Sequence, residues 1–461
     1  MLKTCKNNKE EVLQAIKNGS IDAADIAFPN FIDDVILKMA NDGLLDAFKD
    51  VFEDKRASKN SQIPLNMLFA LAATAKMKLM TSLTDIPFAI TDSDTLAKLG
   101  WNIYDTNRDL EKGLISDGAI RGFLKHYESQ EFVALYNDYA RQTLKNLEHI
   151  PDIHILDCTK INVNIDNENY ENSTVIKDDG KLRRGYKLAS LRGLLDCSGV
   201  IEQIEIGTMK THDLTLSKDI LLNSPALKPG DILIEDRGFL SREIINHLKT
   251  ERGVDTYIPV KKNMDIYIEA VAIAKEQGKW YQHPNKKRKN QQVATVKNLG
   301  SFWQSKNPEG DVELNAAVVY DKKEDEYYVF VTTDLTLSGK QIIKTYELRP
   351  EIEEDFRQLK SFWKLEDFKS TKYTHIVFHI VMLLIGYLYY QLYKNTEEGS
   401  KYANKTLPVI LKKYVPKNKP KNVIIYADNY FGIFRFSEFL DIYASCSEDI
   451  KANLKKALDL I

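Results

Sequence analysis

The sequence predicts an α/β domain in the middle of the chain, with helical regions on both sides. Over residues 151–260, short runs rich in β-branched residues alternate with amphipathic helical patterns. Further strand-like runs fill residues 261–340. Apolar residues recur at three-to-four spacing over residues 1–150 and again over residues 344–395. We therefore expect a core of strands and helices, a β-rich insertion within it, and helices at both ends.

The composition limits the classes of protein to which the chain can belong. Its 461 residues are 43% hydrophobic and 28% charged, which excludes a wholly disordered chain. A net charge of −2 excludes a globally basic nucleic-acid binder, so any charge that binds DNA must be local. The four cysteines lie far apart without a CxxC pair, which fits neither a zinc cluster nor a disulfide framework. A reducing cytoplasm is therefore the expected location.

Residues 1–150 form the predicted N-terminal helical region. Helical spacing of apolar residues is seen at 31–39, 67–72 and 132–139. Ser116 is expected to cap a helix that begins at the next residue. The region contains 18 basic and 22 acidic side chains, so it has no overall positive charge, and no pattern in it proves a helix-turn-helix.

Residues 151–260 form the predicted first part of the α/β core. Five strands are expected, at 153–156, 186–191, 200–206, 232–234 and 257–260. Helices are expected between them, at about 213–222 and 239–250. Strands interleaved with helices are typical of an α/β domain.

Residues 261–340 form the predicted insertion, which we expect to be all-β. Three strands are expected, at about 292–298, 312–320 and 326–333, and the last two flank a hairpin loop. A basic run precedes these strands, and it consists of Lys286, Lys287, Arg288 and Lys289. This run is a candidate for contacts with a nucleic-acid backbone, and a solvated loop is the alternative.

Residues 341–395 are the predicted remainder of the core, and residues 396–461 are a helical C-terminal part that is rich in lysine between 401 and 421. The apolar segment 376–393 approaches the length of a membrane span, but it contains His379 and stands alone in a highly charged chain. We therefore expect it to be a buried core helix and expect no membrane association.

Two aspartates follow predicted buried strands. Asp157 comes after residues 153–156, and Asp236 comes after the strand near residue 234. Because sites in α/β sheets gather at the carboxyl ends of strands, we expect the two side chains to meet there. Alternation along a strand sends Glu235 and Asp236 to opposite faces, so only one of them can join Asp157. The alternative for each aspartate is that it starts a turn or caps a helix.

A third acid, Glu353, lies in a segment with helical spacing. Tyr346, Arg349, Glu353 and Lys360 are separated by three, four and seven residues, which places them along one helical stripe. Pro350 fits a helix only in its first turn, so the helix is expected to begin near this proline, with Tyr346 on the turn before it. A solvated face with weak ion pairs is the alternative interpretation.

Three carboxylates from separate elements would make a chemically coherent metal site. Hard divalent cations such as Mg²⁺ prefer oxygen ligands, usually carboxylates with waters or phosphate oxygens. Two such ions roughly 4 Å apart can activate a water or a sugar hydroxyl and stabilise the leaving oxygen of a phosphoryl displacement. Asp157, Asp236 and Glu353 are therefore the candidate ligands.

These residues resemble a known family. The run that begins at Tyr346 is similar to the Tyr-x2-Arg-x3-Glu-x6-Lys signature of DDE transposases in the insertion-sequence family four group. The sequences around Asp157 and Asp236 resemble the segments that carry the first and second aspartates of that family. The long segment between Asp236 and Glu353 accommodates the β-rich insertion that such transposases carry. The resemblance covers residues 150–395.

The resemblance implies a ribonuclease-H-like core. It implies that Asp157, Asp236 and Glu353 are catalytic and hold Mg²⁺, as two ions, with Mn²⁺ able to substitute. It also implies a transposase that cleaves the ends of its element and joins the freed 3′-hydroxyl to target DNA by direct transesterification. Tyr346, Arg349 and Lys360 would then contact backbone phosphates. The role of hairpin ends in the cleavage is left open.

The same resemblance implies partners and a location. The N-terminal region would recognise the terminal inverted repeats of double-stranded DNA, and pairing two ends implies a homodimer on DNA. The chain would lie in the cytoplasm and associate with the nucleoid when bound to DNA. Two alternatives stay open: a domesticated or inactive descendant that only binds DNA, and a ribonuclease-H-like nuclease that cuts without joining.

Overall fold

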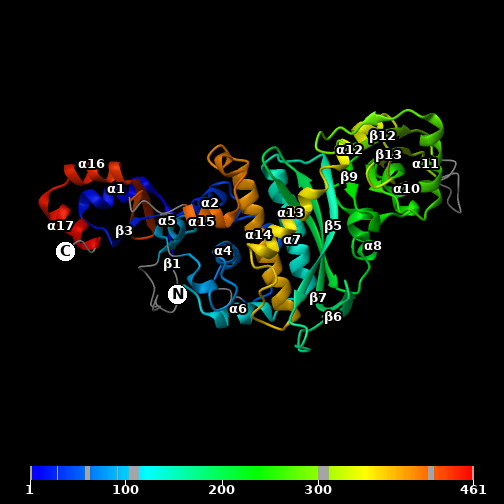
Figure 1. The fold of residues 1–461 in the computed structure, drawn as a ribbon. Helices are drawn as coiled ribbons and strands as arrows, with labels where there is room; N and C mark the ends of the chain where they lie inside the picture. Colours follow the sequence, from blue (N-terminus) through cyan, green and yellow to red (C-terminus); the bar gives the residue numbers. More distant parts are fainter. Residues whose placement is uncertain are drawn as a thin grey trace. The chain divides into compact units, whose positions relative to one another are not determined.

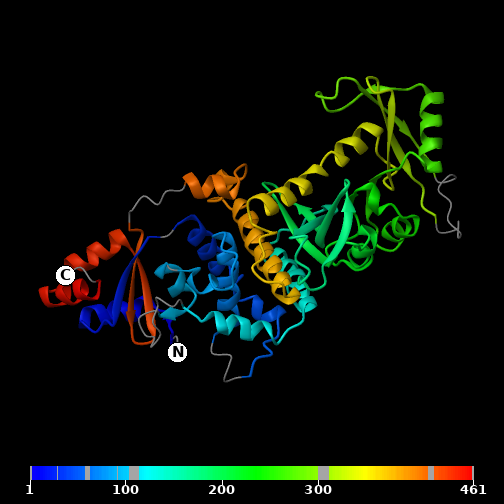
Figure 2. The same ribbon diagram turned by 60° about the horizontal axis from the view of Figure 1, so that its bottom comes forward.

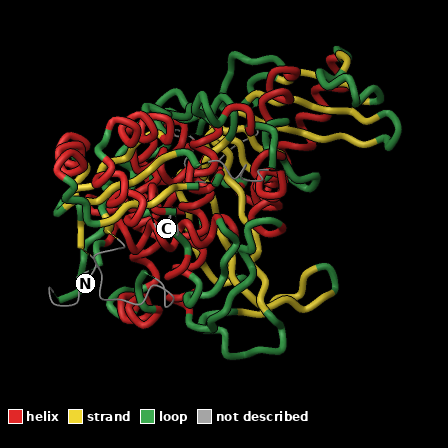
Figure 3. Tube along the Cα trace, turned by 90° about the vertical axis from the view of Figure 1, so that its left-hand side faces the viewer, coloured by secondary structure: helices red, strands yellow, loops and turns green. Residues whose placement is uncertain are grey.

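A computed structural model describes residues 3–28, 30–57, 63–90, 92–102, 114–299, 311–413 and 420–458 of the chain. The chain divides into two compact units (Figure 1). Unit 1 consists of Met1–Tyr139 and Phe362–Ile461, and unit 2 consists of Ala140–Ser361. Strands and helices occur in both units (Figure 3). This confirms the mixed α/β class with helices at both ends of the chain.

Unit 2 is built on one ten-stranded sheet. Its strands are β5 (Ile153–Val163), β6 (Thr174–Asp178), β7 (Lys181–Leu194), β8 (Gly199–Thr208), β9 (Ile232–Glu235), β10 (Asp255–Pro259), β11 (Tyr281–Gln282), β12 (Gln291–Val296), β13 (Asn315–Asp321) and β14 (Glu326–Thr332). Its helices are α8 (Asp213–Leu216), α9 (Lys218–Asn223), η4 (Arg237–Phe239), α10 (Arg242–Thr250), α11 (Asp265–Gln277), α12 (Gly339–Tyr346) and α13 (Pro350–Ser361). The strand order is β11-β12-β13-β14-β10-β9-β5-β7-β6, and β8 pairs with β7 beside β6.

The middle of this sheet is parallel and its two sides are antiparallel. Strand β9 runs parallel to both β5 and β10, whereas β7 runs antiparallel to β5 and β8. The insertion strands join through β14, which pairs antiparallel with β10. The insertion therefore extends the core sheet instead of forming a separate one.

The expectation of an all-β insertion is wrong at residues 265–277. These residues form helix α11, which ends where Gly278 adopts a left-handed conformation with φ of 61°. Alanines at positions 270 and 274 favour a helix and pack inward, and the glycine ends it at low steric cost. The signal was present in the sequence as an alanine-rich run that stops at a glycine.

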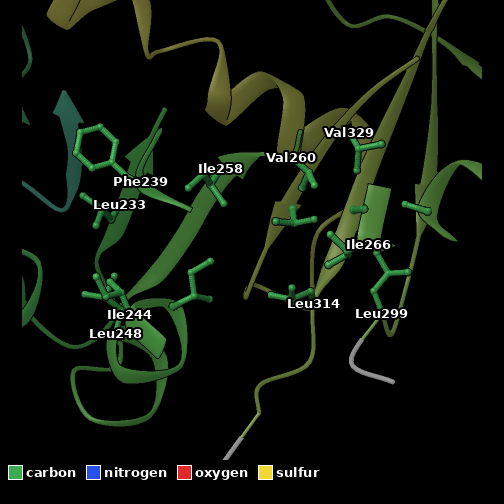
Figure 4. Packing of buried hydrophobic residues seen from close by; sticks show 14 of the residues in the cluster. Leu233, Phe239, Ile244, Leu248, Ile258, Val260, Ile266, Leu299, Leu314 and Val329 are labelled. Atoms are coloured by element: carbon green, nitrogen blue, oxygen red, sulfur yellow. The ribbon is translucent and has the colours of Figure 1, made fainter. Parts of the chain in front are cut away.

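One apolar core joins the central strands to the insertion. Leu233 of β9, Ile244 of α10 and Ile258 of β10 lie in the same buried cluster as Ile266 of α11 and Val329 of β14 (Figure 4). Because this cluster runs across the junction, the insertion strands are held to the sheet by side-chain packing as well as by hydrogen bonds.

Unit 1 contains most of the helices of the chain's two ends. Before unit 2 it has β1 (Lys3–Thr4), β2 (Lys6–Asn7), α1 (Lys9–Asn18), β3 (Ala23–Ala27), α2 (Phe31–Asn41), α3 (Phe48–Val51), α4 (Leu65–Met77), η2 (Ile86–Phe88), α5 (Ser93–Lys98), β4 (Trp101–Asn102), α6 (Asp117–Leu124) and the start of α7 (Ser129–Asn146). After unit 2 it has α14 (Tyr373–Lys394), η7 (Ser400–Tyr402), α15 (Leu407–Lys413), β15 (Asn422–Ala427), β16 (Tyr430–Arg435), α16 (Phe436–Ser445) and α17 (Glu448–Ala457).

The apolar segment near residue 380 forms α14, whose length and hydropathy alone would allow it to cross a membrane. In the structure it packs against α4 and α2 and is buried along its apolar window. The buried helix that the sequence predicts is therefore observed. Ser116 also caps α6 as expected, since its hydroxyl accepts a hydrogen bond of 3.0 Å from the backbone N–H of Ala119.

The sequence predicted a helical C-terminal part, and this prediction is wrong for two segments of it, which form strands. Strands β15 and β16 form a hairpin that joins β2 and β3 in a four-stranded sheet of order β2-β16-β15-β3. Figures 1 and 2 show the N-terminal (blue) and C-terminal (red) segments side by side in this sheet. Two runs rich in β-branched and aromatic residues around the turn at Asp428 carried the signal. Of the lysines between 401 and 421, Lys417 and Lys419 lie outside the described residues.

Candidate active site

The register of two parallel strands brings Asp157 and Asp236 together. Strands β5 and β9 pair as far as Leu156 and Glu235. The residues that follow these two, Asp157 and Asp236, therefore lie at the same level. The sequence predicted that Asp157 stands at the end of a strand, and this is wrong. Strand β5 continues past it, antiparallel to β7, as far as Val163. The two aspartates instead mark the point where pairing between β5 and β9 stops.

Glu235 faces away from this pair. It is fully buried, and neither of its carboxylate oxygens has a hydrogen-bond partner within the described part of the chain. Burial raises the pKa of Glu235 to about 8. Since side chains alternate along a strand, Asp236, and not Glu235, lies on the same side of the sheet as Asp157.

Glu353 comes to the site on helix α13, which packs on β5 (Figure 1). The helix begins at Pro350, as the sequence predicts, because a proline in the first turn lacks only an N–H that would have no partner inside the helix. Ile352, Phe356 and Leu359 form its buried face, and Glu353 lies on the exposed side.

The expected single helical stripe is wrong in its first half. Tyr346 is the last residue of α12, and Arg349 lies in the link before α13. Lys360 lies in the last turn of α13 and is half-buried, about 10 Å along the helix from Glu353 at the usual rise per residue. The break occurs because Pro350 cannot continue the preceding helix.

Arg349 connects the acids. Its Nη2 donates a hydrogen bond of 2.8 Å to Oδ2 of Asp157, and its Nη1 donates to Oε1 of Glu353. The side chains of Arg349 and Asp157 are only 16% and 15% exposed, so the ion pair is shielded from water. Asp236 also interacts with this guanidinium through its charge.

The pKa of Asp157 reports this crowding. Burial raises it, and the guanidinium of Arg349 and the hydrogen bond from the backbone N–H of Cys158 lower it. The charges of Asp236 and Glu353 raise it further, and the result is a pKa of about 6. The charges of Asp236 and Glu353 therefore act on Asp157, as a shared site requires.

The donor chemistry of the site fits a hard divalent cation, but the side chains do not stand in a closed metal-binding arrangement. Among the described residues, no group of three His, Cys, Asp or Glu side chains is placed to hold a metal ion. Arg349 is paired with an oxygen of Asp157 and with one of Glu353. Asp157, Asp236 and Glu353 could hold a cation once the guanidinium releases them.

A cavity of about 540 Å³ lies beside Arg349, and its lining includes Tyr346 and Arg288. Arg288 forms an ion pair of 3.4 Å with Glu347, which follows α12. The structure thus brings one member of the predicted basic run to the link that precedes α13. The other members lie exposed on the loop, and they are Lys286, Lys287 and Lys289.

The sequence interpretation missed two residues that hold α13. Arg192 of β7 donates a hydrogen bond of 2.6 Å from its Nε to Oδ2 of Asp355, and both residues are only 4% exposed. Asp355 lies on the apolar face of α13, and a lone acid on such a face was the available signal.

Comparison with known protein families identifies the domain that contains these residues. The family model of the transposase DDE domain matches residues 150–389, which include Asp157, Asp236 and Glu353. No curated protein matches the sequence.

Proposed function

We propose that this chain, which belongs to the family of transposases with a DDE domain, cleaves transposon ends and joins the freed 3′-hydroxyl to target DNA. The family implies a ribonuclease-H-like fold for the matched residues. The finer assignment, to the insertion-sequence family four group, rests on the residues from Tyr346 to Lys360 that resemble its signature. One observation carries the proposal: Asp157 and Asp236 lie in register where β5 and β9 stop pairing, and Arg349 joins Asp157 to Glu353 of helix α13.

The proposed roles of the site residues follow from their charges: the acids bind cations, and the basic residues bind phosphates. Asp157, Asp236 and Glu353 would hold Mg²⁺, with Mn²⁺ as a substitute, and two bound ions would supply a metal-activated nucleophile and stabilise the leaving oxygen. Arg349 and Lys360 would neutralise backbone phosphates of the transposon end, and Tyr346 would donate a hydrogen bond to one.

We propose two roles in succession for Arg349. In the free chain it neutralises Asp157 and Glu353. A DNA phosphate would offer the guanidinium another anion, with oxygens that it can bind in bidentate fashion. Exchange from carboxylate to phosphate would release the acids for the cation as the substrate arrives.

The proposed partners follow from the reaction. Two transposon ends must be held together, so we expect a homodimer on double-stranded DNA that contains the terminal inverted repeats. The N-terminal helical region would recognise the repeats, and the exposed lysines at 286, 287 and 289 would contact the backbone. We expect the protein to act in the cytoplasm on nucleoid DNA.

The test uses the full chain, Mg²⁺, a labelled duplex made from the DNA that flanks the gene, and a supercoiled plasmid as target. Glu353→Gln is expected to abolish cleavage and joining while DNA binding remains. Glu354→Gln is the matched control, because Glu354 is the next residue on the same helix and pairs with Arg357 at 2.6 Å instead of with Arg349.

Three outcomes decide between the candidates. Cleavage and joining by the wild type and by Glu354→Gln, but not by Glu353→Gln, support the proposal. Hydrolysed ends without joined products would make the chain a nuclease of the same fold. Binding of the duplex without any cleavage by the wild type would favour an inactive descendant that only binds DNA.

A further inference from the structure

A buried ion pair fixes helix α13 on the side opposite its catalytic acid. The guanidinium of Arg192 lies under the helix, with Nε 2.6 Å from Oδ2 of Asp355 and Nη1 3.0 Å from Oε2 of Glu351. Glu351 and Asp355 stand two residues before and two residues after Glu353. Arg192 therefore contacts the helix on both sides of the acid along the chain, through a buried hydrogen bond to Asp355 and a charge contact with Glu351, whose side chain is 47% exposed.

Strand β8 makes room for this guanidinium. A Cβ atom at Gly199 would lie 2.0 Å from Cζ of Arg192, far inside van der Waals contact. Gly199 pairs with Leu194 in the ladder between β7 and β8, so the glycine leaves the space that the arginine fills. The arrangement thus depends on residues from β7, β8 and α13.

Stability alone does not account for such a pair. Removing two charges from water costs about as much as their attraction returns, and replacement of a buried pair by apolar residues is often neutral or stabilising. A hydrogen-bonded ion pair differs from apolar packing because it is directional. The buried apolar face of α13 holds the helix down, whereas Arg192 also sets its rotation and its position along the axis.

We propose that Arg192 is a positioning residue, which acts through Asp355 and Glu351 to hold Glu353 at the height of Asp157 and Asp236. The inference rests on the proposed function, because it assigns Glu353 to the metal site. Without the pair, α13 would stay bound to the sheet by its apolar face, but the carboxylate of Glu353 would no longer be held in one place.

The test replaces the pair with apolar residues in the full chain, as Arg192→Met with Asp355→Leu. Binding of Mn²⁺ is followed by electron paramagnetic resonance, cleavage by kcat and KM for the duplex, and stability by urea unfolding. The expected protein is as stable as the wild type, binds the duplex with unchanged KM, and shows Mn²⁺ affinity and kcat lowered by about 10-fold or more. Arg192→Lys, which keeps a cation opposite Asp355, is expected to lie between the two.

The control removes a different buried charge pair. Glu202→Gln removes the charge of Glu202, whose Oε2 lies 2.6 Å from Nδ1 of His154; both residues are buried. It is expected to lower stability while Mn²⁺ binding stays unchanged. If the apolar pair does not fold, Arg192→Lys compared with Glu202→Gln decides the question in the same way.

Wild-type Mn²⁺ binding and kcat in the apolar pair would overturn the role of Arg192. An equal loss of Mn²⁺ binding in Glu202→Gln would overturn it as well, since the effect would then be a general loosening. A wild-type chain that neither binds Mn²⁺ nor cuts DNA would instead overturn the proposed function on which the inference rests.

Discussion

Replacement of Arg349 by glutamine should strengthen metal binding in the absence of DNA and weaken catalysis in its presence. In the free chain the guanidinium competes with any cation for Asp157 and Glu353. Glutamine is close to the arginine stem in size, but it has no charge and only one donor nitrogen, so it competes less well with a cation for the two carboxylates. The two carboxylates would then be available to a divalent ion.

The contacts set the size of the effect. The hydrogen bond between Arg349 and Asp157 is 2.8 Å long and largely shielded from water, so it falls in the class of charged hydrogen bonds that contribute about 1.5–3 kcal/mol. The contact with Glu353 counts for little, because that carboxylate is 55% exposed. The shielded bond alone corresponds to a gain in Mn²⁺ affinity of about 10- to 100-fold.

The assay is a titration of the DNA-free chain with Mn²⁺, followed by electron paramagnetic resonance, together with cleavage of the labelled duplex. Arg357→Gln is the matched control, because Arg357 lies on α13 but pairs with exposed Glu354. Unchanged or weaker Mn²⁺ binding by Arg349→Gln would refute the reasoning, since it would mean that the guanidinium does not compete with the cation. Full cleavage activity in the same variant would refute its role at the phosphate.

Three further predictions concern stability. Burial alone would lower the pKa of His154, but its hydrogen bonds to Asp231 and Glu202 outweigh burial and raise the pKa to about 9. The unfolding free energy of the wild type should therefore fall by about 3 kcal/mol as the pH rises from 6.5 to above 9. His154→Gln should lack this pH dependence in urea unfolding. Burial raises the pKa of Asp92 to about 6. Asp92→Asn, which can still cap α5, should therefore stabilise the chain by about 3 kcal/mol at pH 7.5 and leave it unchanged near pH 3.5. Gly199→Ala should lower the thermal midpoint, because its Cβ would displace the guanidinium of Arg192 at a cost of about 1–3 kcal/mol.

The signs of the two pH effects follow from proton binding. A histidine with a raised pKa in the folded state stabilises the fold at low pH, and that contribution disappears as the pH passes the folded pKa. A carboxyl group with a raised pKa also favours the fold when protonated, so it costs stability above pH 6. A flat pH profile for the wild type would contradict the first prediction, and equal stabilisation by Asp92→Asn at both pH values would contradict the second.

Much of the candidate site could be predicted from the sequence because its signals are local. Strand alternation separates Glu235 from Asp236, and Pro350 sets the start of α13. The position of Asp157 within β5 could not be predicted, because the second half of that strand is defined by its pairing with β7, a partner distant in the sequence. The same limit applied to α11, where strands on both sides made an all-β segment the simpler interpretation.

The sequence by itself predicted three candidate acids, and it determined the α/β class of the central segment and the buried nature of the helix around residue 380. These features depend on residue type, periodicity and spacing, which are properties of neighbouring residues. Only the tertiary structure decided that Arg349 bridges two of the acids, that Arg192 holds α13 through Asp355, and that the two ends of the chain share one sheet. The contact of Arg349 with Asp157, the contact of Arg192 with Asp355 and the pairing of β3 with β15 each join residues more than 150 positions apart, and folding alone brings such residues within the reach of a hydrogen bond.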